Sequence, residues 1–329
     1  MILVTGGLGY IGSHCVKQLK KQGEEVIILD NLEFGHLGAG SGCKTYIGDI
    51  RDTDLTRKIF RENDIEAVLH FAAYTSVGES VQNPQRYYKQ NVAKTIALME
   101  VMNEFDCKQM IFSSTAATFG EPQYVPIDEN HPQNPKNPYG ASKLMVERIM
   151  KDYETAYGIR SVVLRYFNAS GADPEGEIGE DHTPETHLIP IIIQQALGQR
   201  EKIYVFGNDY DTPDGTCIRD YIHVNDLAKA HLLGLESLRK GHKTEFYNMG
   251  NRTGFSVLEI IKAVEEIAGV KINYEIGERR AGDPAKLIAT SDKIEKELGY
   301  KADFPKVEDT IATAWNWHKN HPHGYNDKF

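Results

Sequence analysis

Residues 3–14, LVTGGLGYIGSH, limit the possible folds of this chain more than any other segment. An apolar run suited to a strand leads into a glycine-rich turn and then into a helical pattern. Two glycine templates overlap there, Gly7-x-Gly9-x-x-Gly12 and Gly6-x-x-Gly9-x-x-Gly12. Such glycines permit a tight turn and let backbone amides approach a pyrophosphate, which lies at the positive end of the helix. A glycine run alone could be only a structural turn, but its position between strand and helix favours a dinucleotide site.

The first half of the chain alternates apolar runs with helical patterns, which is typical of βαβ units and a parallel sheet. We expect strands at 2–5, 26–29, 45–47, 67–71, 110–113 and 161–166, and helices at 10–22, 53–63, 84–105 and 139–157. The Gly/Pro/acidic stretch ADPEGEIGED at 172–181 is typical of a long surface loop. Further on, Ser256 is suited to cap a helix over 256–268.

Asp30 ends the second expected strand, 18 residues beyond Gly12. A carboxylate there accepts hydrogen bonds from a ribose 2′-hydroxyl and repels a 2′-phosphate, which favours NAD over NADP. The alternative is a strand-end aspartate in a turn. Asp49 and Ile50 follow the third strand, where they could border the adenine, although Asp49 could equally cap the next helix.

These features predict an α/β fold with a Rossmann-type doubly wound parallel sheet. We expect an NAD-binding domain over 1–168, with segments near 222–250 returning to it. Residues 169–329 would then form mainly a smaller, mixed α/β C-terminal domain for the substrate.

Composition and charge narrow the function classes. The net charge is −10, and no basic stripe points to nucleic acid. The longest apolar runs are only a few residues, whereas a membrane span needs about 20. The first residues, MILVTGG, carry no charged leader. The four cysteines are scattered without a C-x-x-C pair, so we expect buried thiols, no metal site and a cytoplasmic protein.

The stretch NPYGASK places Tyr139 and Lys143 four residues apart, on one face of an expected helix. A tyrosine with a pKa near 10 is a poor base at neutral pH. A nearby ammonium stabilises the phenolate and lowers that pKa, so the pair can transfer a proton. Such pairs occur by chance in many helices. This one follows a glycine fingerprint and a strand that ends in Ser113-Ser114-Thr115, which favours a catalytic role.

This combination resembles the short-chain dehydrogenase/reductase superfamily in its extended, sugar-nucleotide-modifying branch. Longer motifs resemble, in order and spacing, the UDP-glucose 4-epimerase family: FAAYTSVGES at 71–80, IFSSTAATFGEP at 111–122, LRYFNASGA at 164–172, FGNDYDTPDGTCIRDYIHVNDLA at 206–228, YNMGN at 247–251 and RRAGDP at 279–284. The resemblance covers essentially the whole chain. It implies an isomerase that interconverts UDP-glucose and UDP-galactose at sugar carbon 4 through a 4-keto intermediate, with NAD as cofactor, acting as a homodimer.

The resemblance also implies residue roles. Tyr139 would take the proton of the 4-hydroxyl, Lys143 would hold the nicotinamide ribose, and Thr115 would bridge the sugar to the tyrosine. The implied cofactor-binding residues are Gly6, Gly9, Tyr10, Ile11, Gly12, Asp30, Asn31, Leu32, Gly35, Asp49, Ile50, Phe71, Ala72, Ala73, Asn91, Ser113, Tyr139, Lys143 and Phe167. The implied substrate-binding residues are Thr115, Tyr139, Asn168, His187, Leu188, Tyr204, Val205, Phe206, Arg219, Arg280, Asp283 and Leu287. Two arginines suit a diphosphate because guanidinium groups bind oxyanions bidentately; without the resemblance, solvated surface charges would explain both.

Four positions depart from the family pattern or vary within it. Thr75 stands where some members have a lysine near the cofactor pyrophosphate, and Thr115 replaces a serine but keeps the hydroxyl. His187 stands at a position that is often asparagine, near the uridine. Leu287 falls where members vary between tyrosine and a small residue, a position that gates N-acetylated sugars.

Three other functions use the same fold. A 4,6-dehydratase needs an acid and a base after the threonine, but Thr115 is followed by Ala116 and Ala117. A non-catalytic dinucleotide sensor would often lack Tyr139 or Lys143. The main alternative keeps the same chemistry and acts on UDP-glucuronate, a UDP-pentose or a UDP-N-acetylhexosamine.

Overall fold

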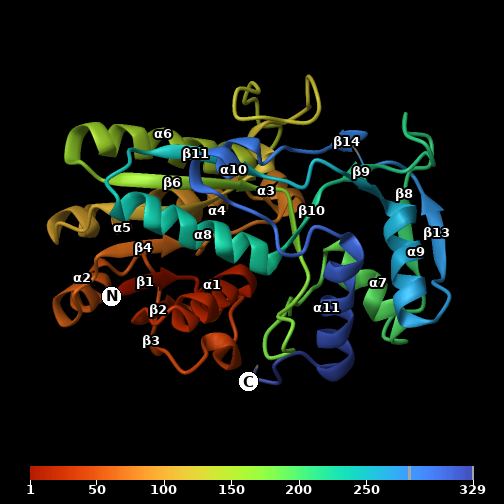
Figure 1. Cartoon of the computed structure of the whole chain (residues 1–329), viewed down its shortest axis with the longest axis horizontal. Coiled ribbons are helices and arrows are strands. Elements are labelled where there is room, and N and C mark those ends of the chain that lie inside the picture. Colours follow the sequence, from red (N-terminus) through yellow and green to blue (C-terminus); the bar gives the residue numbers. More distant parts are fainter. Residues whose placement is uncertain (281–282, 328–329) are drawn as a thin grey trace.

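The computed structural model describes residues 1–280 and 283–327. Its centre is a seven-stranded sheet in which every neighbouring pair is parallel (Figure 1). In spatial order the strands are β11 (Glu245–Met249), β6 (Arg160–Tyr166), β5 (Gln109–Thr115), β4 (Ala67–His70), β1 (Ile2–Thr5), β2 (Val26–Asp30) and β3 (Lys44–Ile47). The doubly wound α/β prediction is confirmed.

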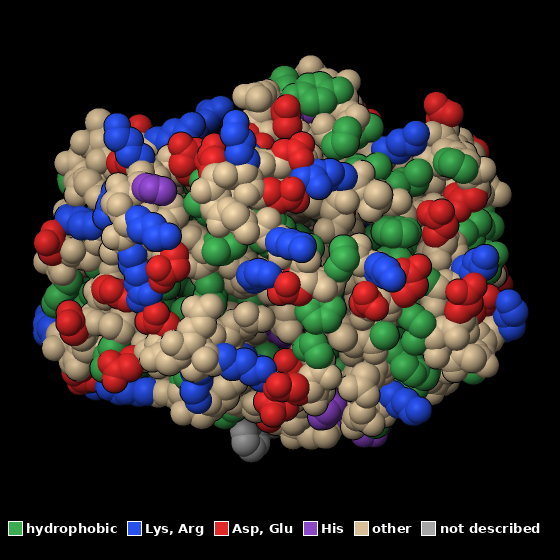
Figure 2. Space-filling model, in the orientation of Figure 1, with side chains coloured by type: hydrophobic (Ala, Val, Ile, Leu, Met, Phe, Trp, Pro, Cys, Tyr) green, Lys and Arg blue, Asp and Glu red, His purple; other side chains and the backbone are tan. Residues whose placement is uncertain are grey.

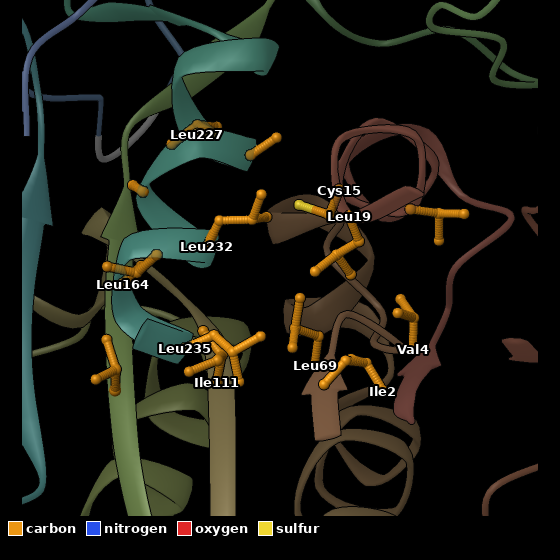
Figure 3. Packing of buried hydrophobic residues seen from close by; sticks show 14 of the residues in the cluster. Ile2, Val4, Cys15, Leu19, Leu69, Ile111, Leu164, Leu227, Leu232 and Leu235 are labelled. Carbon is orange, nitrogen blue, oxygen red and sulfur yellow. The ribbon is translucent and has the colours of Figure 1, made fainter. Parts of the chain in front are cut away.

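Helices cover both faces of this sheet because successive strand residues point to opposite sides. Ile2 and Val4 belong to the core beneath α1 (Tyr10–Lys21) and α8 (Val224–Arg239). Leu3 belongs to the opposite core, beneath α2 (Thr53–Glu62), α5 (Lys94–Glu104) and α6 (Pro138–Tyr157). Figure 3 shows the first core, where side chains of α1 and α8 lie over β1, β4, β5 and β6. Burial on both faces explains why the strands read as continuous apolar runs.

A second lobe lies beside the sheet, at the right in Figure 1. Its core is formed by three helices, α7 (Leu188–Ala196), α9 (Val257–Ala268) and α11 (Val307–Asn320), and by the buried side of β8 (Ile203–Phe206). Strand β8 pairs in parallel with β13 (Tyr274–Gly277), whose side chains are largely exposed. Short strands β9 (Ile218–Arg219), β12 (Phe255–Ser256) and β14 (Lys286–Leu287) form a small sheet, and β7 (Asn168–Ser170) pairs with β10 (Tyr221–His223). The remaining helix, α10 (Asp292–Leu298), contacts β11 and α8. The predicted domain boundary at residue 168 stays a prediction.

Most predicted elements agree with the structure within two residues, and the cap is as predicted. Ser256 accepts the backbone N–H of Glu259, whose side chain in turn accepts the backbone N–H of Ser256, a capping box.

The helix expected over 84–105 is instead divided. It comprises α4 (Pro84–Tyr87), a π-helical turn at Tyr88–Ala93 and then α5, and the short α3 (Val77–Gln82) precedes it. An amphipathic pattern cannot reveal such a local change of pitch.

The segment 172–181 is a loop as predicted, but its two ends are buried and not at the surface. Only its middle is exposed, whereas Asp173 and Glu180 are buried. Lys17 makes an ion pair of 2.7 Å with Asp173, and Trp317 donates its ring N–H to the backbone oxygen of Glu180. Acidic residues therefore lie inside because the fold provides partners for them.

In the described ranges, no helix is both long and apolar enough to cross a membrane. On the face seen in Figure 2, basic and acidic side chains are interspersed. All four cysteines are free; Cys15, Cys107 and Cys217 are buried as expected, whereas Cys43 is half-buried.

Candidate active site

A cavity of about 770 Å³ lies where the parallel strands end at their carboxyl side. Most of the proposed cofactor residues line it: Gly6, Gly9, Tyr10, Ile11, Gly12, Asp30, Asn31, Gly35, Asp49, Ile50, Phe71, Ala72, Ala73, Ser113, Tyr139, Lys143 and Phe167. Four proposed substrate residues line the same cavity: Thr115, Tyr139, Asn168 and His187. The segments after five different strands thus meet in one place.

Two positions of the turn require glycine, because a Cβ would collide with neighbouring backbone atoms and because one of them has a positive φ. A Cβ at Gly12 would lie 2.2 Å from the backbone oxygen of Gly6. Gly6 has a φ of +72°, and a Cβ there would lie 2.6 Å from the backbone nitrogen of Ala72. Helix α1 can therefore begin directly against the turn, with Gly9 as its N-cap. This is the cradle that a pyrophosphate needs at a helix N-terminus.

Asp30 is held by backbone amides at the end of β2. Its carboxylate accepts the N–H of Leu8 at 3.1 Å and that of Leu32 at 2.9 Å. Burial raises the pKa of Asp30, and these hydrogen bonds oppose the rise. Each carboxylate oxygen has a second lone pair for a ribose hydroxyl. These two hydrogen bonds fix the direction of the Asp30 side chain at the end of β2.

Asp49 does not cap α2, because the N-cap is Asp52, which accepts the N–H of Leu55. Asp49 instead pairs with Lys94 at 2.5 Å and accepts the N–H of Arg51. Burial alone would raise the pKa of Asp49, but these partners lower it. The carboxylate is therefore free of a capping role and lies on the cavity wall.

Tyr139 and Lys143 project from the first turns of α6, whose N-cap Asn137 accepts the N–H of Gly140. Burial raises the pKa of Tyr139, and a hydrogen bond with Thr115 opposes this. Burial lowers the pKa of Lys143 to about 7. The Lys143 ammonium donates to the backbone oxygen of Ser113 at 2.7 Å. The pKa values of Tyr139 and Lys143 are therefore further apart than those of free tyrosine and lysine, and the expected lowering of the tyrosine pKa is not seen in the protein chain alone.

A buried ion pair lies behind this lysine. Arg165 donates twice to Glu147, at 3.0 and 2.8 Å, and Ser114 donates to the same carboxylate at 2.6 Å. The charge of Glu147 opposes the burial effect and raises the pKa of Lys143. Glu147 thereby helps to keep the lysine protonated.

Two proposed cofactor residues do not line the cavity. Leu32 has a positive φ of 60° and donates its backbone N–H to Asp30. Asn91 is buried in the π turn, where it accepts the backbone N–H of Tyr74 and donates to Ser142. Leu32 hydrogen-bonds with Asp30, and Asn91 with Tyr74, and both of these partners line the cavity. We therefore expect Leu32 and Asn91 to position the cavity wall and not to contact the cofactor through their side chains.

The remaining proposed substrate residues form a separate group on the second lobe. Leu188 begins α7, Tyr204, Val205 and Phe206 lie on β8, Arg219 lies on β9, and Leu287 lies beside it on β14. Arg219 lies 3.6 Å from Asp283, and Arg280 stacks on the ring of Phe206 at 4.0 Å. With only 13% of its side chain exposed, Arg219 is not a solvated surface charge. The side chain of Val205 is buried, and the residue pairs with Ile276 of β13 in the parallel ladder. Residues 281 and 282 of the RRAGDP motif lie outside the described ranges.

Several wall residues escaped the sequence reasoning. Arg86 lies over the ring of Tyr74 at 4.3 Å and pairs with Glu33 at 2.7 Å. His182 and Glu180 also reach this wall from the 172–187 segment. Of these residues, only Glu180 fell in a segment that was expected at the surface, and no motif in the sequence singled out Arg86 or His182.

His187 is oriented by two buried carboxylates. Its Nδ1 lies 2.8 Å from Glu180 and 3.0 Å from Glu185. Burial would lower the pKa of His187, but these carboxylates raise it well above its usual value. The ring nitrogen Nε2 is left for a ligand in the cavity.

The fold and this cavity define a dinucleotide-dependent enzyme of the Rossmann type with a tyrosine–lysine pair at the site. A family model described as the NAD dependent epimerase/dehydratase family matches residues 2–250. A UDP-glucose 4-epimerase of Halalkalibacterium halodurans is 55% identical over 324 residues, which cover 98% of this chain and 97% of that relative. The chain belongs to the NAD-dependent epimerase/dehydratase family, and NAD is its cofactor.

Solved structures agree with this assignment. A crystal structure of a UDP-glucose 4-epimerase matches with a TM-score of 0.97 and 52% identity, covering 99% of each chain. The UDP-glucose 4-epimerase of Bifidobacterium longum, solved in complex with NAD⁺ and UDP, matches with a TM-score of 0.93 and 42% identity, covering 98% of this chain and 99% of that one.

Proposed function

We propose that this chain interconverts UDP-glucose and UDP-galactose by reversible epimerisation at carbon 4 of the sugar, through a 4-keto intermediate. The observation that carries the proposal is the position of Tyr139, Lys143 and Thr115 on one wall of the cavity that begins at the glycine turn. The full-length similarity to UDP-glucose 4-epimerases supports this reading over the alternative UDP-sugars.

Each side chain then has one task. The Tyr139 hydroxyl takes the proton of the sugar 4-hydroxyl and later returns it, and Thr115 positions that hydroxyl. The Lys143 ammonium stabilises the phenolate through its charge. NAD, when bound, supplies a hydride acceptor that gives the hydride back. Because the sugar must present both faces, affinity has to come from the UDP group, for which Arg219 and Arg280 are the proposed ligands.

The direct test is to incubate the purified protein separately with UDP-galactose, UDP-N-acetylgalactosamine and UDP-glucuronate, and to identify the products by NMR. UDP-glucose formed from UDP-galactose supports the proposal. Turnover of UDP-glucuronate alone would replace it with the alternative substrate class.

We predict that the purified protein carries NAD without any being added. The reaction regenerates NAD in each cycle, and Asp30, which lines the cavity, keeps lone pairs that can accept a ribose 2′-hydroxyl. Denaturation and filtration should release close to one nicotinamide nucleotide per chain, measured by chromatography. Release of mainly NADP would contradict the role proposed for Asp30.

We predict that UDP-galactose is preferred over UDP-N-acetylgalactosamine because of Leu287. Its side chain packs with Phe167, a cavity residue, on the cluster of Phe119, Ile127 and Ala289. Overpacking costs about 1–3 kcal/mol, or roughly tenfold to a hundredfold in specificity. The measurement is kcat/KM for both substrates in wild type and in Leu287→Ser. Equal efficiencies in wild type would remove Leu287 as the gate, as would a variant that gains nothing with the N-acetylated sugar.

We also propose a cytoplasmic homodimer. Within the two segments expected as helices at 84–105 and 139–157, the apolar Met99 and Leu144 are buried within the single chain, whereas Val92, Ile96 and Ile149 are partly exposed. Neighbouring side chains on α3, the π turn and α6 are more exposed: Val77, Val81, Tyr88 and Met145. These surfaces give a continuous candidate contact, because α6 contacts both α3 and the π turn.

Light scattering should therefore give twice the chain mass of 37.0 kDa at micromolar concentration. Met145→Glu should shift the particle toward the single-chain mass, because it buries a charge at the proposed contact. Val270→Glu changes an equally apolar, exposed residue on the other lobe and should leave the mass unchanged. A 37 kDa wild-type particle would overturn the dimer.

A further inference from the structure

Four side chains of the 180–187 segment point one polar atom each toward a common centre. They form what we call the Glu/His cluster, which consists of Glu180, His182, Glu185 and His187. One donor atom from each lies within 4.8 Å of the others. Only 4% of the Glu180 side chain and 2% of the Glu185 side chain are exposed, whereas 26% of His182 and 52% of His187 are exposed. Two buried carboxylates therefore face two accessible imidazoles.

The contacts within the cluster outnumber the hydrogens available to make them. Nδ1 of His187 lies 2.8 Å from Glu180 and 3.0 Å from Glu185. Nδ1 of His182 lies 3.1 Å from Glu180 and 3.7 Å from Glu185. Each Nδ1 carries at most one hydrogen, and these two hydrogens make the His182–Glu180 and His187–Glu185 hydrogen bonds, so the other two nitrogen–oxygen contacts are pairs without a hydrogen bond. A single cation at the centre would satisfy all four groups at once.

The spacing and ligand types match a small divalent ion. Donor atoms held about 2.0–2.1 Å from Zn²⁺ in a tetrahedron are about 3.3 Å apart, close to the contacts in the cluster. Imidazole nitrogen and carboxylate oxygen are both ligands of Zn²⁺. Mg²⁺ prefers oxygen ligands in an octahedron and keeps several waters. The cluster offers two nitrogens and lacks that arrangement.

The surroundings provide support and access. The Glu185 carboxylate also accepts the backbone N–H groups of Thr186 and His187, at 2.7 and 2.8 Å, which fixes its direction. Such outer contacts typically hold a metal ligand in place. A second cavity, of about 300 Å³, is bordered by three members of the cluster and by His318, His321 and His323. This second cavity is a path by which an ion could reach the cluster, and further imidazoles line it.

We propose that the Glu/His cluster is a binding site for one divalent transition-metal ion, with Zn²⁺ as the expected occupant. The ion would tie residues 180 and 187 together at the rim of the main cavity, because the same segment lines both cavities. Its role would be structural, since the four ligands belong to one segment of the cavity wall and His182 packs edge-on against the Tyr10 ring at 6.3 Å. The scattered cysteines had predicted no metal site, and this inference departs from that expectation.

The test uses the NAD-loaded protein as purified, dialysed against a chelator and titrated with ZnCl₂ in a calorimeter. We expect one ion per chain with a micromolar or tighter Kd, and four-coordinate visible absorption bands with Co²⁺. His182→Gln and Glu185→Gln should each weaken Zn²⁺ binding at least tenfold. Glu177→Gln is the matched control, because it removes a carboxylate from the acidic group around Lys17, and its Kd should equal that of wild type.

The calorimeter measures Zn²⁺ binding without any epimerase assay. A failure of the metal-site proposal can therefore be distinguished from a failure of the proposed epimerase function. If Glu185→Gln melts early because it alters a buried group, His182→Gln still decides the question, since that side chain is partly exposed. Absence of Zn²⁺ binding at millimolar concentration overturns the proposal. So does an unchanged Kd in His182→Gln, which would assign the ion to the histidines of the second cavity, or equal binding of MgCl₂.

Discussion

Replacing Tyr139 with phenylalanine is expected to lower kcat by about 10²–10⁴-fold, the usual contribution of a general acid–base group. This corresponds to about 3–5 kcal/mol of transition-state stabilisation. The substitution removes the hydroxyl that hydrogen-bonds with Thr115 but keeps the ring, which packs edge-on against Tyr87 at 6.4 Å. UDP affinity and melting temperature should therefore stay close to those of wild type.

Tyr153→Phe provides the control on the same helix. Tyr153 also lies on α6, three to four turns beyond Tyr139, where it packs with Tyr157 and on the helix-covered core. Its variant should keep the wild-type rate. A Tyr139→Phe enzyme with near wild-type turnover would assign the base to another group, and equal losses in both variants would indicate a general effect on α6.

Gly12→Ala is expected to remove most of the bound NAD and to destabilise the protein. The added methyl group would lie 2.2 Å from the Gly6 oxygen, so α1 and the turn would have to move apart. Overpacking of this kind costs about 1–3 kcal/mol. The two measurements are the melting temperature and the nucleotide released per chain on denaturation.

Gly78→Ala is the matched control, because Gly78 also lies in a helix and a Cβ there meets nothing within 4 Å. Alanine in a helix is favoured over glycine by up to about 1 kcal/mol, so this variant should be as stable as wild type or slightly more so. If Gly12→Ala retained full NAD content and stability, the turn would not need to fit as tightly as its geometry indicates.

The strands of the sheet could be predicted because a strand that is buried on both faces requires a run of mostly apolar residues. The runs at 2–5 and 161–166 are mostly apolar, and each lies within a residue of its strand. The residues after these strands could be assigned to one cavity because parallel strands end at the same edge. Gly6, Asp30 and Tyr139 line one cavity for that reason.

The features that escaped prediction depend on contacts between distant segments. Glu180 is acidic and looked exposed, yet it is buried beneath Trp317, which lies 137 residues further along the chain. The π turn that carries Asn91 depends on its hydrogen bonds to Tyr74 and Ser142. The local pattern of polar and apolar residues contains no information about such partners. A charged loop is therefore predicted to be exposed to solvent even where distant segments bury it.

The position of β11 has a consequence for how the chain is made. This strand completes the sheet beside β6, but it begins 79 residues after β6 ends. At the usual rate of about 5–20 residues per second, a ribosome needs roughly 4–16 s to add that stretch. During this interval β6 is an unpaired sheet edge, which is a template for pairing with another chain. The newborn protein is therefore most open to aggregation, and most in need of a chaperone, after β6 has emerged and before β11 follows.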